Sequence, residues 1–261
     1  MIKALYTSAT GMKAHQFFLD VVANNLANVN TAGFKRVQAN FQDLLYDKII
    51  AAGAESAQGL QSPTGLQVGS GVRVIATNKV FSQGVPENTG RTLDMAIQGQ
   101  GFFQISHPDG TTVYTRDGAF QLNSDGELVN SEGLKLDPAI TISGDVIAIN
   151  IGSDGTVSAQ SSDGIVQSLG QITLAIFPNA AGLENLGRNL YRETTASGSP
   201  QTGIPGQTGI GEIMQGFIES SNVELVTEMV NLIVAQRAYE TSSKAIKASD
   251  EMLSTTNRVV S

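Results

Sequence analysis

Apolar residues recur every seven positions near the C-terminal end of the chain, within residues 220–261. The stripe consists of Leu225, Leu232, Tyr239, Ile246 and Leu253. A seven-residue apolar repeat keeps one side of a helix facing a partner helix. The interleaved row holds the small residues Ala235, Ser242 and Ser249, which leave room for another backbone to approach closely. The pattern therefore predicts a long helix that needs a partner.

The N-terminal end of the chain carries a matching stripe. Its members are Leu5, Met12, Leu19 and Leu26, and Ile2, Ala9, Gln16 and Ala23 interleave with them at spacings of three and four. Such a pattern suits either an amphipathic helix packed on its own domain or one strand of a coiled coil. A second heptad run at the other end of the chain favours the coiled coil. The two helices can pair within one chain or between chains.

Between these ends, short apolar runs alternate with turn residues from Val72 to Phe177. Asp-Gly occurs five times there, beginning at positions 109, 117, 125, 154 and 163. This dipeptide supplies the positive φ angles that tight hairpins require, and several runs alternate with period two, as in a strand. The pattern predicts a middle domain made of antiparallel strands.

Two further stretches are expected to connect the helices to the β-domain. Residues 51–71 are rich in Gly, Ala, Ser and Gln, which is typical of a mobile linker or of an ordered arm between subunits. Residues 34–50 fit a helical face as well as an extended one, so their conformation stays open.

The predicted fold class is therefore α+β: N- and C-terminal helices form a coiled-coil domain, joined by an extended connector to an inserted, mainly antiparallel all-β middle domain. The expected domains are residues 1–33 plus 220–261 for the helical part, 34–77 plus 190–219 for the connector with an arm at 46–65, and 78–189 for the all-β part.

Composition excludes several classes of protein. A net charge of −8 argues against a nucleic-acid partner, which requires a clustered basic surface. The chain has no cysteine, so disulfides and thiolate metal sites are excluded. No apolar run reaches the roughly 20 residues that a transmembrane helix needs. The first 30 residues also lack the apolar core and cleavage site of a secretory signal, so we expect export without a cleaved signal peptide.

No arrangement of side chains points to catalysis, a metal, a cofactor or a small-molecule substrate. His15 and His107 stand in unlike contexts without metal-ligand spacing. Gly99-Gln100-Gly101 lacks the third glycine, the lysine and the helix of a nucleotide-binding loop. Residues 121–132 match part of a calcium-binding loop, but Gln121 replaces the expected aspartate, so a hairpin is the better interpretation.

Three segments resemble the bacterial flagellar rod and hook proteins. ANNLANVNTAGFKR at 23–36 looks like the N-terminal signature of that family, and SNVELVTEMVNLIVAQRAYETSSKAIKASDEML at 221–253 is similar to its C-terminal signature. LDMAIQGQGFFQI and YTRDGAFQLNSDGELV resemble the shared β-domain. The motif positions are Asn24, Asn25, Asn28, Gly33, Phe34, Gln236, Arg237 and Tyr239. The chain length and the arm within residues 44–73 are most similar to the branch of the family that builds the distal rod.

This resemblance implies a structural subunit of a helical tube, a homo-oligomer whose assembly interface is the two heptad stripes. It implies proximal rod and hook proteins as neighbours along the axis, surrounding P-ring and L-ring proteins, and delivery by the flagellar type III export apparatus. The expected location is the basal body, spanning the periplasm towards the outer membrane.

Two alternatives remain at this point. One is another axial protein of the same family, from the proximal rod or the hook. The other is a secreted protein that binds or cleaves peptidoglycan, although glycosidases need paired carboxylates and no such pair can be named here. The aromatic content of 6% and the absence of tryptophan argue against an adhesin, because such proteins usually expose aromatic side chains.

Overall fold

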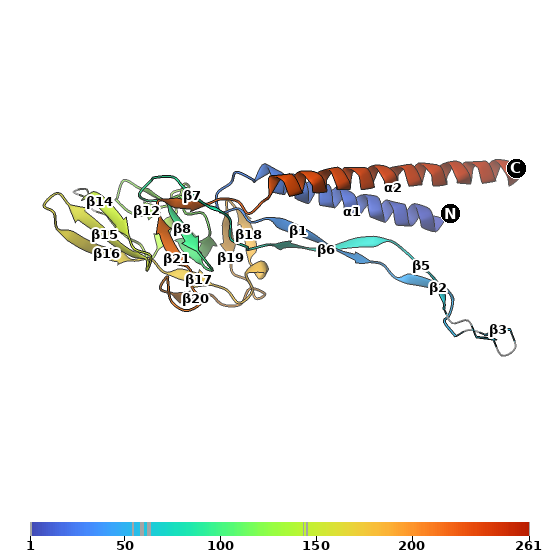
Figure 1. Cartoon of the computed structure of the whole chain (residues 1–261), viewed down its shortest axis with the longest axis horizontal. Coiled ribbons are helices and arrows are strands. Elements are labelled where there is room, and N and C mark those ends of the chain that lie inside the picture. Colours follow the sequence, from blue (N-terminus) through green and yellow to red (C-terminus); the bar gives the residue numbers. More distant parts are fainter. Residues whose placement is uncertain are drawn as a thin grey trace. The chain divides into compact units, whose positions relative to one another are not determined.

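A computed structural model describes residues 2–53, 55–57, 60–61, 64–142, 144 and 146–260. It confirms the predicted α+β class, with a helix near each end of the chain and mainly antiparallel strands between them (Figure 1). The chain forms two compact units. The helical unit comprises residues 1–27, 37–78 and 224–261, and the β unit comprises residues 28–36 and 79–223.

The helical unit contains α1 (Ile2–Ala27) and α2 (Leu225–Val260), which lie side by side and run in opposite directions (Figure 1). Both helices therefore form where the heptad patterns predict them. Coiled-coil packing of one helix into the other stays a prediction.

The rest of the helical unit is a β-ribbon. Its three successive strand pairs are β1 (Val37–Asp43) with β6 (Val72–Lys79), β2 (Tyr46–Ile50) with β5 (Leu66–Gly69), and β3 (Glu55–Ala57) with β4 (Leu60–Gln61). Residues 37–43 and 46–50 are thus extended rather than helical. The expected arm at 46–65 coincides with the β2 to β4 part of the ribbon, although residues 54, 58, 59, 62 and 63 lie outside the described part of the chain.

One asparagine attaches the start of the ribbon to α1. The buried Asn25 side chain donates from Nδ2 to the Val37 carbonyl at 2.8 Å and accepts from the Val37 N–H at 2.9 Å. It therefore pairs with the first residue of β1 as a neighbouring strand would. At a second contact between α1 and β1, the rings of Phe18 and Phe41 meet edge to face, with centroids 6.0 Å apart.

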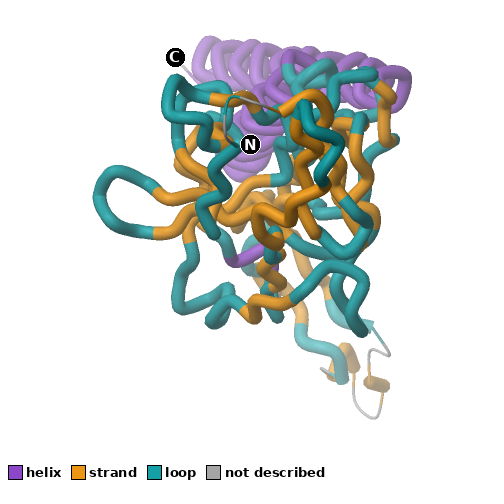
Figure 2. Tube along the Cα trace, turned by 90° about the vertical axis from the view of Figure 1, so that its left-hand side faces the viewer, coloured by secondary structure: helices purple, strands orange, loops and turns teal. Residues whose placement is uncertain are grey.

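The β unit contains a nine-stranded sheet, a three-stranded sheet and two short strand pairs; strands are orange in Figure 2. The order in the large sheet is β11 (Gln121–Leu122), β12 (Leu128–Val129), β13 (Lys135–Asp137), β9 (Phe102–Ser106), β10 (Thr112–Thr115), β19 (Leu190–Arg192) and β18 (Glu184–Gly187), with β17 (Leu174–Ile176) pairing both β9 and β20 (Gln201–Gly203). A separate sheet has β14 (Val146–Ile151), β15 (Thr156–Ser161) and β16 (Val166–Gln171). Two short pairs are β8 (Met95–Gln98) with β21 (Glu212–Gln215), and β7 (Pro86–Asn88) with β22 (Phe217–Glu219).

Apolar side chains from these sheets form a continuous core that includes Met95, Phe103, Phe120 and Leu174. Residues 190–219, which we expected in the connector, supply strands to this unit. The division of the chain into three domains stays a prediction.

Four of the five Asp-Gly pairs lie in hairpin turns, as predicted. Gly110, Gly126, Gly155 and Gly164 all have positive φ and join β9 to β10, β11 to β12, β14 to β15 and β15 to β16. The fifth prediction is wrong, because Gly118 has no positive φ and joins no hairpin. A Cβ atom on Gly118 would lie 1.5 Å from the Met95 carbonyl oxygen, so glycine is needed there for close backbone approach.

Candidate assembly surface

The row of small residues on α2 faces α1. A Cβ atom on Gly11 of α1 would lie 3.6 Å from the Ser242 hydroxyl oxygen, so the two backbones come close at this point. Ala235 and Ser249 stand seven residues to either side of Ser242 and are buried. Residues seven apart lie on nearly the same side of a helix. The predicted close-approach row is therefore brought against the partner helix within one chain.

The large residues of the two stripes are less completely covered. Leu5, Met12, Leu19 and Leu26 of α1 are half-buried, as are Leu232, Tyr239, Ile246 and Leu253 of α2, whereas Leu225 is exposed. On α1 the fully buried residues are Ala14, Val21, Val22 and Asn25. Of these, Ala14, Val21 and Asn25 share the face of Phe18, which packs on the ribbon.

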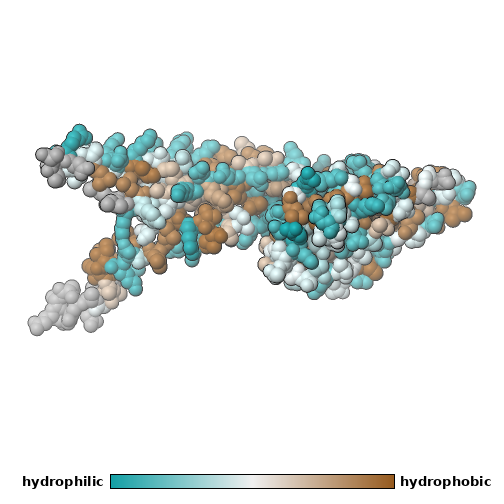
Figure 3. All heavy atoms as spheres, turned by 180° about the vertical axis from the view of Figure 1, so that it is seen from behind, coloured by the Kyte–Doolittle hydropathy of each residue, from teal (hydrophilic) through white to brown (hydrophobic). Residues whose placement is uncertain are grey.

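A second apolar face covers the first third of α2. Leu225, Val226, Met229, Val230, Ile233 and Val234 are each between 46% and 67% exposed. Val226, Val230, Ile233 and Val234 lie opposite the buried Glu228 and Ala235, whereas Met229 lies at the edge of this face and Leu225 belongs to the heptad stripe. Figure 3 shows brown, apolar surface along the helices and along the ribbon of this unit. A helix that is apolar on both sides is normally buried on both sides.

The ribbon also exposes large apolar side chains. Those most exposed include Leu45 at 88%, Ile49, Ile75 and Tyr46. Exposed apolar surface of this kind marks contacts with other macromolecules. Among the described side chains, the ribbon and the helices thus form an uncovered apolar surface within a single chain, which we call the assembly surface.

The family-motif residues divide into two groups. Asn25, Gly33 and Phe34 are buried, and each has a partner in its own chain. Gly33 adopts φ +68°, donates its N–H to the Glu219 carbonyl at 2.7 Å, and has no room for a side chain because a Cβ would lie 2.6 Å from the Asp117 nitrogen. Asn28 accepts a 3.2 Å hydrogen bond from Thr31, and Asn24 is exposed with its own interactions.

The C-terminal motif residues point outwards instead. Gln236 is exposed, and Arg237 is exposed with a 3.2 Å ion pair to Glu240, while Tyr239 is half-buried. A surface pair of this kind contributes little to the stability of one chain. These side chains are therefore available for contacts outside the chain.

Three buried charged side chains were not predicted from the sequence: Lys35, Arg116 and Glu219. The Lys35 ammonium lies 2.5 Å from one Glu219 carboxylate oxygen, and the Arg116 guanidinium lies 3.2 Å from the other. Glu219 also accepts the Gly84 N–H at 2.7 Å, and Lys35 donates to the Ser82 carbonyl at 2.7 Å. We call these three side chains the buried charge cluster. It joins the segment after α1 to β22 and to Arg116, the residue that follows β10, within the β unit.

Burial lowers the pKa of Lys35, and the nearby Glu219 carboxylate offsets part of that effect. Because an unpaired buried charge is far more costly than a paired one, each member of the cluster depends on the others. The cluster has a structural role, since its hydrogen-bond partners among the described residues are backbone carbonyls, a backbone N–H and the members of the cluster themselves.

The described residues contain no group of His, Asp and Glu side chains that could hold a metal ion. Neither helix is long and apolar enough over its described length to cross a membrane. The two histidines are apart from any site: His107 pairs with Asp109 at 3.0 Å in the β9–β10 turn, and His15 is half-buried on α1.

Comparison with known proteins assigns the chain to a family. Three family models match: the flagella basal body rod protein model at residues 5–35, the flagellar hook protein FlgE/F/G D1 domain at 96–159, and the flagellar basal body rod FlgEFG protein C-terminal model at 214–259. The α1 stripe from Leu5 to Leu26, strands β9 to β14 of the β unit and nearly all of α2 lie within the matched ranges.

Full-length relatives agree with these models. The flagellar basal-body rod protein FlgG of Buchnera aphidicola (from Schizaphis graminum) is 48% identical over 97% of this chain and 98% of the relative. FlgG of Borreliella burgdorferi is 46% identical over 99% of both chains. A crystal structure of the Helicobacter pylori flagellar hook protein FlgE2 is 17% identical over 71% of this chain and 43% of that one, and its TM-score of 0.25 is too low to support a shared fold.

Identity of 46–48% over nearly the whole length shows that the chain and these relatives belong to one family. The matched family is structural, and its members form the axial part of the flagellum together with other rod and hook proteins. The chain belongs to the flagellar basal-body rod protein family.

Proposed function

We propose that this chain, as a structural subunit of the flagellar basal-body rod, assembles helically with copies of itself into the distal rod. The resulting stiff tube transmits torque from the motor to the hook, and its lumen forms part of the export channel. The terminal helices pack as coiled coils in the inner layer of the tube. No bond is made or broken, and the function is carried by packed interfaces.

The observation that carries the proposal is the second apolar face of α2, from Val226 to Val234. Val226, Val230, Ile233 and Val234 are between 54% and 67% exposed in one chain although the opposite face of the helix is buried. Covering the exposed half of such side chains is worth roughly 1 kcal/mol each. That gain repeats at every subunit, which favours a long assembly over a free chain.

The heptad stripes fit the same interface. Leu19 and Leu232 represent the large residues that stay half-buried in one chain, and a neighbouring helix would complete their burial. The exposed Gln236 lies beside the stripe on α2, and the exposed Arg237 lies one turn after Ile233 on the second apolar face, so both are placed to make polar contacts to neighbouring subunits. In this arrangement each α2 contacts its own α1 and the helices of adjacent subunits.

The ribbon is proposed to stiffen the tube. Residues 46–65 would bridge neighbouring subunits through exposed side chains such as Leu45, Tyr46 and Ile49. Deleting residues 46–65 should give curved or flexible tubes in electron micrographs of the purified, assembled protein. Straight tubes after the deletion would favour a proximal-rod role instead.

The partners follow from that location. We expect the proximal rod and hook proteins at the two ends of the tube, and the P-ring and L-ring proteins around it. The flagellar type III export apparatus would deliver the chain without a cleaved signal peptide. The tube would then span the periplasm towards the outer membrane.

The central test changes Ile233 on the second apolar face. Ile233→Asp places a charge in the proposed interface, whereas Ala248→Asp places the same charge on an exposed position of the same helix. Both variants should keep the wild-type circular dichroism spectrum, and only Ile233→Asp should abolish tubes in sedimentation and electron microscopy. Normal tube formation and motility by the Ile233→Asp variant would remove the basis of the proposal.

A further inference from the structure

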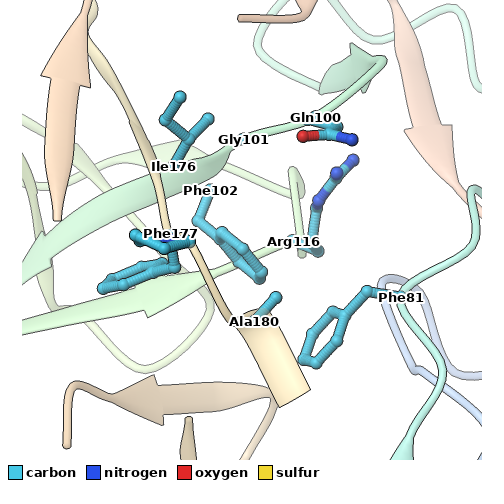
Figure 4. A pocket seen from close by; sticks show the side chains of 9 residues that line it. Phe81, Gln100, Gly101, Phe102, Arg116, Ile176, Phe177 and Ala180 are labelled. Carbon is cyan, nitrogen blue, oxygen red and sulfur yellow. The ribbon is translucent and has the colours of Figure 1, made fainter. Parts of the chain in front are cut away.

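A pocket of about 210 Å³ opens in the β unit between β9, β17 and the 3-10 turn Ala180–Gly182 (Figure 4). Its walls include the rings of Phe81, Phe102 and Phe177, with Gly101 and Ala180 at its edges. A protein cavity of about 150 Å³ is large enough for a benzene ring. The pocket can therefore accept one large aliphatic side chain and part of its backbone.

One cation lines this apolar pocket. The Arg116 side chain is 4% exposed and lies against the Phe102 ring at 5.4 Å, and Figure 4 shows it extending past that ring towards Gln100. Its terminal nitrogens bond Glu219 at 3.2 Å and the Gly99 carbonyl at 2.7 Å. Its Nε–H has no hydrogen-bond partner among the described residues. A buried donor without an acceptor is costly, so a ligand that brings an oxygen acceptor to this Nε–H would be favoured.

A second feature of the same unit has the complementary chemistry. The tip of the β15–β16 hairpin exposes Ile165 at 66% and Val166 at 65%, and the neighbouring β14 exposes Ile147 at 73%. Asp163 lies exposed in the turn, two residues before Ile165. The turn is closed by hydrogen bonds from Ser161 N to the Ile165 carbonyl at 3.0 Å and from Gly164 N to the Ser161 carbonyl at 3.0 Å. The tip is thus a preformed projection with aliphatic side chains and one carboxylate.

We infer that the β15–β16 tip of one copy of this chain docks into the Arg116 pocket of the next copy. Ile165 enters between the phenylalanine rings, and the Asp163 carboxylate accepts the free Nε–H of Arg116. The buried charge cluster holds two cations and one carboxylate, so the added carboxylate is favourable in charge as well. Because the tip and the pocket are different surfaces, the contact is head-to-tail and can propagate along an open assembly.

This inference rests on the proposed self-assembly, and the absence of cysteine makes it directly testable. Ser162→Cys places a thiol in the tip, and Ala180→Cys places one at the pocket edge. The two variants are mixed as full-length chains, one of them isotope-labelled, and treated with a short bismaleimide linker. Mass spectrometry then counts cross-links between labelled and unlabelled copies. The matched control is Ser124→Cys with Ala180→Cys, because Ser124 occupies the comparable exposed turn of the β11–β12 hairpin.

The tip pair should cross-link at least about tenfold more than the control pair, as expected when burial of an isoleucine selects one pose. Adding Ile165→Asp should lower the yield to the control level, whereas Gln167→Asp, on an exposed neighbour, should not. Equal yields for the tip and control pairs would overturn the docking, whether or not tubes are present. Electron microscopy of the same samples separately decides the proposed assembly: tubes without the tip cross-link would leave that proposal standing and remove only this contact.

Discussion

Replacing Glu219 by glutamine should destabilise the β unit strongly although the side chain keeps its size. Glu219 is the only carboxylate of the buried charge cluster, and it faces Lys35 at 2.5 Å and Arg116 at 3.2 Å. A glutamine amide offers one oxygen where the carboxylate offers two. Its NH₂ group would therefore face one of the two cations, donor against donor, and the missing negative charge would leave both cations buried without compensation.

The size of the effect follows from the burial. The side chains of Lys35, Glu219 and Arg116 are 0%, 1% and 4% exposed, so solvent cannot replace the lost charge. Breaking a fully buried ion pair from one side typically costs about 3–5 kcal/mol. For a unit of roughly 150 residues, each kcal/mol lowers the melting temperature by about 2–4 °C. We therefore expect Glu219→Gln to lower the melting temperature of the β unit by about 10 °C.

Differential scanning calorimetry of the full chain measures this shift, and hydrogen exchange in peptides covering β9 and β10 assigns it to the β unit. Glu184→Gln is the matched control, because Glu184 forms a 2.8 Å pair with Arg192 in which both side chains are about half exposed. Loss of an exposed pair costs at most about 1 kcal/mol, so the control should melt almost as the wild type does.

A second substitution tests the cause. Lys35→Met in the Glu219→Gln background removes one of the two uncompensated cations and should restore part of the lost stability, which is a coupling that independent sites would not show. If Glu219→Gln and Glu184→Gln melt within about 2 °C of each other, corresponding to less than about 1 kcal/mol, the cluster does not stabilise the β unit as argued.

The remaining predictions concern three other positions. Gly118→Ala should prevent folding of the β unit in a solubility and calorimetry assay, because its Cβ would lie 1.5 Å from a carbonyl oxygen, whereas Gly110→Ala, with φ +79° and open space, should cost only about 1 kcal/mol. Ala235→Leu should overpack the contact between the helices and lower urea stability of the helical unit by about 1–3 kcal/mol. Burial lowers the pKa of Lys79 from 10.5 to about 8, so the folded chain binds fewer protons than the unfolded chain between these values. Stability should thus rise with pH through that window, and Lys79→Met should remove the rise in urea unfolding measured from pH 7 to 10.

Local patterns predicted the elements whose partners lie nearby. The hairpin turns at Gly110, Gly126, Gly155 and Gly164 follow from Asp-Gly, because the required positive φ is a property of the dipeptide itself. Asp117-Gly118 is the same dipeptide, but Gly118 must be glycine for a reason other than a positive φ angle. Its constraint is the backbone of Met95, 23 residues away, which no local pattern records.

The ribbon shows the same limit. Residues 37–50 fit a helical spacing as well as a strand, and the strand prevails because β1 and β2 pair with β6 and β5. Such pairing is a tertiary effect that overrides weak local preference. The polar contacts are equally absent from local patterns: Asn25 hydrogen-bonds Val37, and Lys35 pairs with Glu219, 184 residues further along the chain.

The α2 helix shows what exposure adds to a heptad pattern. The sequence defines one stripe, from Leu225 to Leu253, and one stripe requires one partner. The structure gives α1 as that partner at Ala235, Ser242 and Ser249, yet leaves Val226, Val230, Ile233 and Val234 uncovered on the other side of the helix. A single partner cannot cover two opposite faces, and the described residues of the chain supply no second helix. Beyond residue 234 the outer face becomes polar, so the requirement for a second partner is confined to the part of α2 that begins at Leu225. An interface between subunits should therefore be densest at that end of the helix, and charges introduced there should disrupt assembly more than the same charges near Ala248.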